Sequence, residues 1–147
     1  MINVMNMKRY QLIAAKAQTN TATASASWDT LGSDWATITL NFGIELNTNA
    51  VGPTISVLES DDTVVTNHAT IVANRTAEDL VAAKNVHYDI DLRARKRYLR
   101  LTVTTATATN DDVTFAAFGT LSRLENSPDS TTDRVNSTND VVVSVLT

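Results

Sequence analysis

Hydrophobic and polar residues alternate along several short stretches of this chain. Alternation with a period of two is the pattern of a β-strand with one face buried and the other in solvent. A clear case is residues 37–42, in which one side of the strand carries Ile38, Leu40 and Phe42. Residues 54–58 repeat the pattern, with Ile55 and Val57 on the inner side. Asp61 and Asp62 then supply turn residues before residues 63–65, and we expect a hairpin.

The strongest alternation lies in residues 86–92 and 98–104. Their inner positions hold Val86, Tyr88, Ile90 and Leu92 in the first stretch and Leu99, Leu101 and Val103 in the second. The connection between the two stretches is strongly basic, with Arg93, Arg95, Lys96 and Arg97. The pattern predicts a basic loop between two strands. After turn residues at 110–112 comes an apolar run, residues 113–121, which we expect to form a long antiparallel hairpin with residues 98–104.

Many short strands, and frequent threonine with valine and isoleucine, indicate an all-β protein. The sole helix candidate, residues 76–84, is equally compatible with a loop. The predicted fold is a jelly-roll-like antiparallel β-sandwich with extended N- and C-terminal segments.

The predicted domain organisation is a sandwich over residues 1–124, including an N-terminal arm, followed by a linker and a β-prone tail over residues 125–147. Residues 17–27 are small and polar, as in a flat edge strand or an extended arm. The apolar run at residues 141–146 can close the chain's own sheet or pair with a neighbouring subunit. We favour the first arrangement.

Composition excludes several classes of function. The formal net charge of −4 argues against nucleic-acid binding, because a nucleic-acid surface is usually basic. No cysteine is present, so disulfides and thiolate zinc sites are excluded. No stretch approaches the ~20 apolar residues of a membrane span, and the N-terminal region lacks the uninterrupted apolar core of a signal peptide. We expect a soluble protein without membrane contact.

Candidate catalytic and metal-binding groups are sparse. His68 and His87 have carboxylates nearby in Asp89 and Asp91, but neither a HExxH spacing nor a third ligand is present. No nucleophile motif occurs, and four glycines are too few for a phosphate-binding loop. The sequence predicts no enzyme, no cofactor and no metal site.

Two tryptophans, Trp28 and Trp35, stand out in a chain with 5% aromatic residues. A surface pair of indoles can stack on sugar rings, but the area of each ring favours burial against the core. The basic loop also has two interpretations. Its side chains either pair locally with carboxylates such as Asp89 and Asp91, or form a positive projection that docks on an acidic partner.

Residues 96–104, followed by an Asp-containing turn and an apolar strand that ends at residues 118–121, resemble a pattern in head decoration proteins of tailed bacteriophages. An earlier segment, Ile55–Asp62, is similar to a second part of that pattern. The resemblance covers about half of the chain, residues 54–121.

The resemblance implies a non-enzymatic, capsid-stabilising protein on the virion surface, made in the host cytoplasm. It would bind the major capsid protein and bridge neighbouring capsomers, commonly as an oligomer, for which we expect a trimer. The expected contacts to the capsid or a neighbouring subunit are Arg93, Arg95, Lys96, Arg97, Val141 and Val143. The alternative is a carbohydrate- or receptor-binding sandwich of a phage fibre or extracellular protein, with Trp28 and Trp35 as stacking residues.

Overall fold

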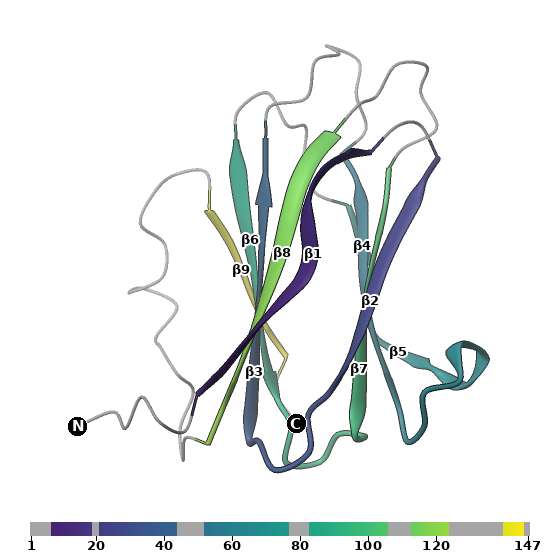
Figure 1. The fold of residues 1–147 in the computed structure, drawn as a ribbon, viewed down its shortest axis with the longest axis vertical. Coiled ribbons are helices and arrows are strands. Elements are labelled where there is room, and N and C mark those ends of the chain that lie inside the picture. The colour runs from purple at the N-terminus through teal and green to yellow at the C-terminus, as the bar shows by residue number, and fades with distance from the viewer. Residues whose placement is uncertain are drawn as a thin grey trace.

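Two β-sheets pack face to face in this computed structural model, which describes residues 7–18, 21–43, 52–76, 83–105, 113–123 and 140–145 (Figure 1). The larger sheet has the strand order β1-β8-β3-β6-β9 and consists of β1 (Lys8–Gln18), β8 (Val113–Ser122), β3 (Trp35–Phe42), β6 (Lys84–Asp91) and β9 (Asp140–Val145). The smaller sheet has the order β2-β7-β4-β5 and consists of β2 (Thr23–Asp29), β7 (Tyr98–Thr104), β4 (Thr54–Ser60) and β5 (Ala69–Thr76).

The order of the first eight strands is that of a jelly roll. Strands 1-8-3-6 form one layer and strands 2-7-4-5 form the other, so that successive strands from β1 to β4 alternate between layers. All neighbours among these eight strands are antiparallel, whereas β9 adds to β6 in parallel. The predicted jelly-roll-like sandwich is confirmed.

The core lies between the two sheets, and the side chains that fill it stand at the alternate positions that the sequence predicts to face inward. Its fully buried side chains include Ile38 and Leu40 from β3, Ile55 and Val57 from β4, Tyr88 and Ile90 from β6, and Leu99, Leu101 and Val103 from β7. Burial of each large aliphatic side chain contributes ~1.5 to 3 kcal/mol relative to its exposure to water. The alternating pattern therefore identified the buried faces correctly.

The expected hairpin of residues 98–104 with residues 113–121 is wrong. β7 pairs with β2 and β4 in the smaller sheet, whereas β8 pairs with β1 and β3 in the larger one. Alternation indicates which face of a strand is buried, and that face is the same whether the two strands are neighbours in one sheet or lie in opposite sheets of a sandwich. It does not report the partner strand, so the turn residues between them suggested a hairpin that does not form.

The predicted hairpin after residues 54–58 exists, but its return strand begins later. β4 pairs with β5, which starts at Ala69, and a 3₁₀ turn at Val65–Asn67 occupies the connection. Asp62 organises this connection, since its carboxylate accepts hydrogen bonds from the backbone N–H of Val64 (2.8 Å) and the side-chain amide of Asn67 (2.8 Å). Asp62 thus acts through turn chemistry, whereas Asp61 pairs with Lys96 of the basic loop.

The C-terminal run pairs within the chain, as we favoured. β9 lies along the edge of β6, with Val141 opposite Val86 and Val143 opposite Tyr88. Residues 77–82 of the helix candidate and residues 125–139 of the predicted linker lie outside the described residues.

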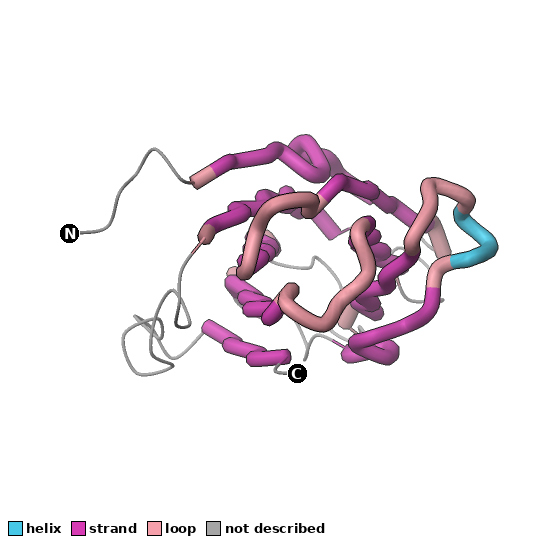
Figure 2. The backbone as a smooth tube through the Cα atoms, turned by 90° about the horizontal axis from the view of Figure 1, so that it is seen from below, coloured by secondary structure: helices cyan, strands magenta, loops and turns pink. Residues whose placement is uncertain are grey.

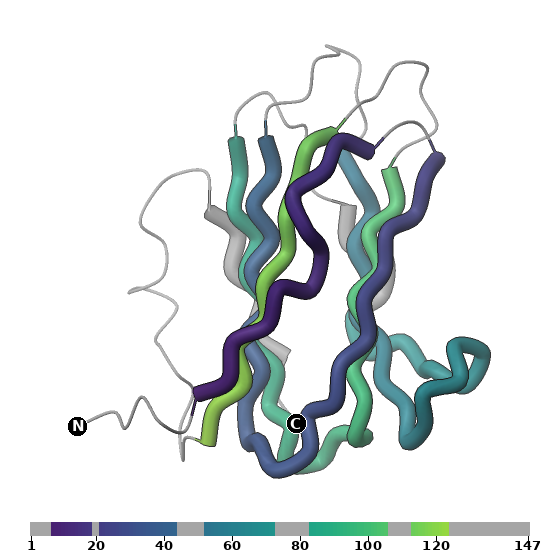
Figure 3. Tube along the Cα trace, viewed as in Figure 1, coloured from purple at the N-terminus to yellow at the C-terminus, as the bar shows by residue number. Residues whose placement is uncertain are grey.

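β1 forms the opposite edge of the larger sheet and runs antiparallel beside β8 (Figures 1 and 3), to which it pairs with an irregular register. Register shifts occur between Gln11 and Ile13 and again between Ile13 and Lys16. Gly119 permits the first irregularity, because a Cβ at this position would lie 3.1 Å from Cδ1 of Leu12. The bulged strand therefore packs Leu12 into the space of a missing side chain.

Candidate partner-binding surfaces

The basic loop, residues 92–97, connects β6 to β7 at the lower end of the sandwich in Figure 1. Figure 2 shows this end, where the loop lies beside the connection from β2 to β3. Backbone hydrogen bonds join the two, from Thr30 N–H to the carbonyl of Arg97 (2.9 Å) and from Leu92 N–H to the carbonyl of Asp34 (2.8 Å). The expected position of the basic cluster, between two strands, is therefore correct.

Each of the four cationic side chains in the basic loop has a carboxylate partner in the same chain. Arg93 donates through Nε to Asp91 at 2.9 Å, and Lys96 Nζ lies 3.2 Å from Asp61. The other two pairs are Arg95 with Glu59 (3.9 Å) and Arg97 with Asp29 (2.6 Å). The loop is thus locally neutralised, as the first interpretation of its charges expected. Its role in docking stays a prediction.

Arg97 and Asp29 form two parallel hydrogen bonds between guanidinium and carboxylate, as Arg93 and Asp91 also do. The hydrogen bond from Arg97 lowers the pKa of Asp29 below its ordinary value and raises the pKa of Arg97. The Arg97 guanidinium also lies 5.0 Å from the ring centre of Tyr98. Such contacts fix the direction of the side chain at the edge of the loop.

The two tryptophans are buried, with only 7% of Trp28 and 3% of Trp35 exposed. Trp28 belongs to the main core cluster, and the guanidinium of Arg93 lies 5.7 Å from the ring centre of Trp35. Burial of the indoles agrees with the core interpretation. A sugar ring has no exposed indole face to stack on at these two positions.

The histidines lie far apart in the fold. His87 shares a hydrogen bond with the hydroxyl of Thr39 (3.1 Å) in the larger sheet, and His68 bonds to the carbonyl of Val64 (3.0 Å) in the β4–β5 connection. Within the described ranges, no three histidine, aspartate or glutamate side chains are grouped to hold a metal ion. No helix in that part of the chain is long and apolar enough to cross a lipid bilayer.

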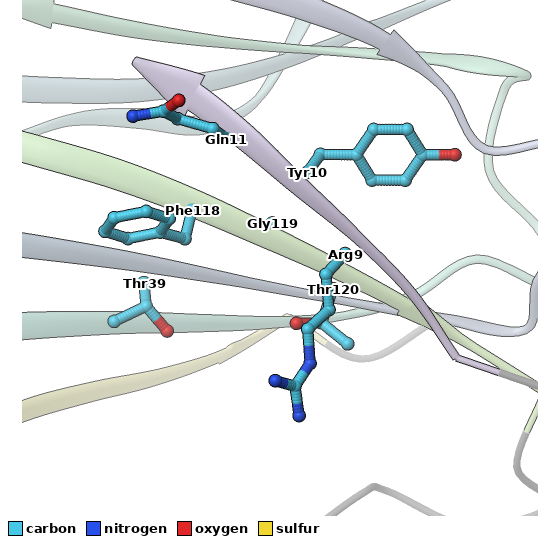
Figure 4. A pocket seen from close by; sticks show the side chains of 7 residues that line it. All are labelled: Arg9, Tyr10, Gln11, Thr39, Phe118, Gly119 and Thr120. Atoms are coloured by element: carbon cyan, nitrogen blue, oxygen red, sulfur yellow. The ribbon is translucent and has the colours of Figure 1, made fainter. Parts of the chain in front are cut away.

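A second candidate surface, which the sequence interpretation missed, is a hollow on the outer face of the larger sheet. Its cavity volume is about 400 Å³, and its lining comes from three adjacent strands: Arg9, Tyr10 and Gln11 from β1, Phe118, Gly119 and Thr120 from β8, and Thr39 from β3. We call it the sheet-face hollow. Figure 4 shows Gln11, Phe118 and Thr39 in succession across the strands, with Arg9 extending beside Thr120 and Tyr10 directed away from them.

The strand register explains how these residues meet. Phe118 of β8 lies opposite Gln11 of β1 on one side and Thr39 of β3 on the other, and Arg9 lies opposite Thr120. The sequence contains one indication of this surface. Residues at even positions of β8 face outward, so Phe118 is a large apolar residue on an otherwise polar or small face, and 43% of it is exposed.

Comparison with solved structures gives the fold relationship. A chain of infectious bursal disease virus, Gx strain, matches with a TM-score of 0.51 at 12% sequence identity, over 82% of this chain and 33% of that one. A chain of the viral particle of the same virus matches with a TM-score of 0.50 at 11% identity, over 80% of this chain and 31% of that one. Our chain spans about a third of the length of these structures.

At this level of identity, the likeness shows the fold: this chain is a jelly-roll β-sandwich of the kind found within those viral chains. A carbohydrate-binding module of family 11 from Clostridium thermocellum gives a TM-score of 0.38 at 11% identity, over 85% of this chain and 94% of the module. No protein-family model matches the sequence, and no curated protein matches it. The fold is thus a jelly-roll β-sandwich, and its two candidate contact surfaces are the basic loop and the sheet-face hollow.

Proposed function

We propose that this protein is a non-enzymatic decoration protein, which binds the outer surface of an assembled phage capsid and stabilises it by bridging neighbouring capsomers. The observation that carries the proposal is the placement of the two segments that resemble such proteins. Ile55–Asp62 contains most of β4, and residues 96–104 contain β7; these strands are hydrogen-bonded neighbours, with Ile55 opposite Val103 and Ser60 opposite Tyr98.

One ion pair and one hydrogen bond join the two segments at the same end of the sheet. Asp61, in the first segment, pairs with Lys96, in the second, at 3.2 Å, and Glu59 accepts a hydrogen bond from the backbone N–H of Lys96 at 3.2 Å. Two stretches that are separate in the sequence therefore form one structural unit. This supports the view that their joint resemblance to decoration proteins reflects a shared β4–β7 substructure.

The proposed mechanism is stabilisation by binding. A protein that binds only the assembled shell stabilises it by RT ln(1 + [L]/Kd) per site, and many copies repeat this contribution over the shell. The expected partner is the major capsid protein, the expected assembly a homotrimer, and the expected location the virion surface after synthesis in the host cytoplasm. The net charge of −4 gives no support for contact with the genome.

Cryo-electron microscopy of phage heads with and without the added protein tests the proposal, together with heat inactivation of the same heads. Regular extra density outside the capsid and a higher temperature of head disruption are the expected results. Light scattering of the free protein measures its oligomeric state. Heads that bind no protein at saturating concentration and disrupt at an unchanged temperature would contradict the proposed function.

A further inference from the structure

We propose that the sheet-face hollow binds acidic sugar residues of a glycan, with a sugar ring on Phe118 and its carboxylate on Arg9. The inference concerns a ligand site on the larger sheet and does not depend on the capsid-binding role. A volume of about 400 Å³ lies within the range of ~300 to 1,000 Å³ that is usual for small-ligand sites.

Phe118 supplies the apolar part of the site. Its ring stands on the outer face of β8 between Gln11 and Thr39, and 43% of the residue is exposed. A pyranose ring presents C–H groups on its faces and hydroxyl groups around its edge. One exposed phenyl ring with polar neighbours on both sides matches that distribution, because the aromatic face is electron-rich and apolar.

Polar side chains surround the ring with both donors and acceptors. The amide of Gln11 has two donors and an acceptor, and the hydroxyls of Thr39 and Thr120 each donate and accept. Sugar hydroxyls have the same dual character. All these side chains project from strands, whose backbone hydrogen bonds hold them in place before a ligand arrives.

Arg9 selects for an acidic sugar. Unlike the four cations of the basic loop, exposed Arg9 forms no ion pair with a carboxylate in the described part of the chain. A guanidinium is suited to a carboxylate, because it can donate two parallel hydrogen bonds to the two carboxylate oxygens. A uronic or sialic acid provides such a carboxylate on the ring that stacks on Phe118.

Other occupants fit less well. A protein partner would be expected to bury several apolar side chains, but Phe118 is the single exposed large hydrophobic residue among strands β1, β3, β6 and β8, whose side-chain exposure the structure describes. A phosphate group or a nucleic acid would favour several cations, and the lining of the hollow contains one. The combination of one ring, one guanidinium and dual-character polar groups favours an acidic sugar.

Binding to a panel of immobilised oligosaccharides, in which each uronic- or sialic-acid glycan has a neutral counterpart, provides the first test. The intact protein should bind members of the acidic half and give at least tenfold weaker signals on their neutral counterparts. Silence on the acidic half, or equal binding to both halves, would overturn the proposal. Backbone amide shifts on titration with a bound glycan should centre on residues 9–11 and 118–120; shifts centred on the smaller sheet would also overturn it.

Variants separate the two contacts. Phe118→Tyr keeps a ring and should bind as the original protein does, whereas Phe118→Leu keeps apolar volume and should lose about tenfold or more in affinity. Arg9→Gln should lose about tenfold for the acidic glycan and leave the weak binding of its neutral counterpart unchanged. Unchanged affinity in either Phe118→Leu or Arg9→Gln would rule out the corresponding contact.

Arg100→Gln is the matched control, because Arg100 lies on the smaller sheet and donates to the hydroxyl of Ser25 at 2.8 Å. It removes one positive charge without touching the hollow, so any general effect of net charge appears in this variant. If Arg100→Gln loses as much affinity for the acidic glycan as Arg9→Gln does, the proposed role of Arg9 in the hollow is contradicted. Head binding by Phe118→Leu distinguishes this proposal from the decoration role, since the latter can hold while glycan binding fails.

Discussion

An ion pair between Arg97 and Asp29 joins the start of β7 to the end of β2. The guanidinium approaches the carboxylate through Nε at 3.0 Å from Oδ1 and through Nη2 at 2.6 Å from Oδ2. The same two strands are already paired through their backbones, with Asp29 opposite Tyr98. The ion pair therefore fixes the basic loop to the sandwich at the point where the loop ends.

Replacing Asp29 by Asn should lower thermal stability slightly and in a pH-dependent way. The pKa of Asp29 is lowered in the folded protein by the hydrogen bond from Arg97, so its contribution is present above the ordinary value of 3.8 and is lost as the pH falls through the lower folded value. Because the pair is partly exposed, we expect a fall in Tm of about 1 to 3 °C at pH 7. Thermal melts at pH 7 and pH 2.5 should show the difference shrinking at the lower pH; a difference that grows there would contradict the assignment.

Gly32→Ala should destabilise the turn between β2 and β3. Gly32 has φ +77°, and a Cβ would lie 2.6 Å from Nη2 of Arg123, whose Nε donates to the carbonyl of Gly32. The left-handed backbone costs a non-glycine residue about 1 to 2 kcal/mol. Urea unfolding of Gly32→Ala beside Ser33→Ala measures the cost, and equal midpoints for the two variants would show that the turn tolerates a side chain.

Leu101→Ala should be the more severe change, because Leu101 is fully buried between the sheets. Truncation of such a side chain costs about 2 to 5 kcal/mol through lost burial and the remaining cavity. Thr102→Ala, on the outer side of the same strand, is the control and should cost much less. Similar unfolding midpoints for the two variants would contradict the burial of Leu101 in the core.

Lys96→Gln tests whether the basic loop docks on the capsid. Lys96 and its partner Asp61 are both well exposed, so their ion pair is weak, and Lys96 can exchange Asp61 for a carboxylate on an acidic partner surface. The variant should bind heads a few-fold more weakly and with a smaller dependence on salt. Lys16→Gln, on the exposed edge of β1, is the control for net charge. Identical head occupancy for both variants at low salt would remove Lys96 from the contact.

Deleting the chain from Asn126 onward removes β9 and opens the edge of β6. The eight jelly-roll strands remain, so circular dichroism should still report a β-sandwich, while head occupancy falls and self-association rises. Light scattering and cryo-electron microscopy of the same preparation measure both effects. Full occupancy by the shortened protein would exclude the tail from docking, and loss of the β-sheet spectrum would show that β9 is needed for folding.

The local features of this protein follow from its sequence, and the non-local ones do not. Alternation in residues 98–104 identified the buried face because parity depends only on those residues. The partner of β7 depends on residues far away, so the hairpin with β8 was wrong. Likewise, the pairing of Arg93 with Asp91 follows from their proximity in the sequence, whereas the pairing of Arg97 with Asp29 requires the sheet register.

The sheet-face hollow illustrates the same limit. Arg9, Thr39 and Phe118 belong to three strands whose order in the sheet is not their order in the chain. No face was assigned to Phe118 from the sequence, and an isolated apolar residue on a polar face carries little information by itself. The site becomes recognisable once β1 is placed beside β8 and β3.

The position of β1 at one edge of the larger sheet sets the order of events during synthesis. Lys8 pairs with Leu121, roughly 110 positions later in the chain, and β8 is the one strand that flanks β1 in the described part of the larger sheet. During synthesis, β1 therefore has no partner strand in its sheet until β8, the last of the eight jelly-roll strands, has been translated. Pairing of β1 is for that reason a late event in folding, and a nascent chain stalled before β8 would expose β1 to other proteins that bind unpaired strands.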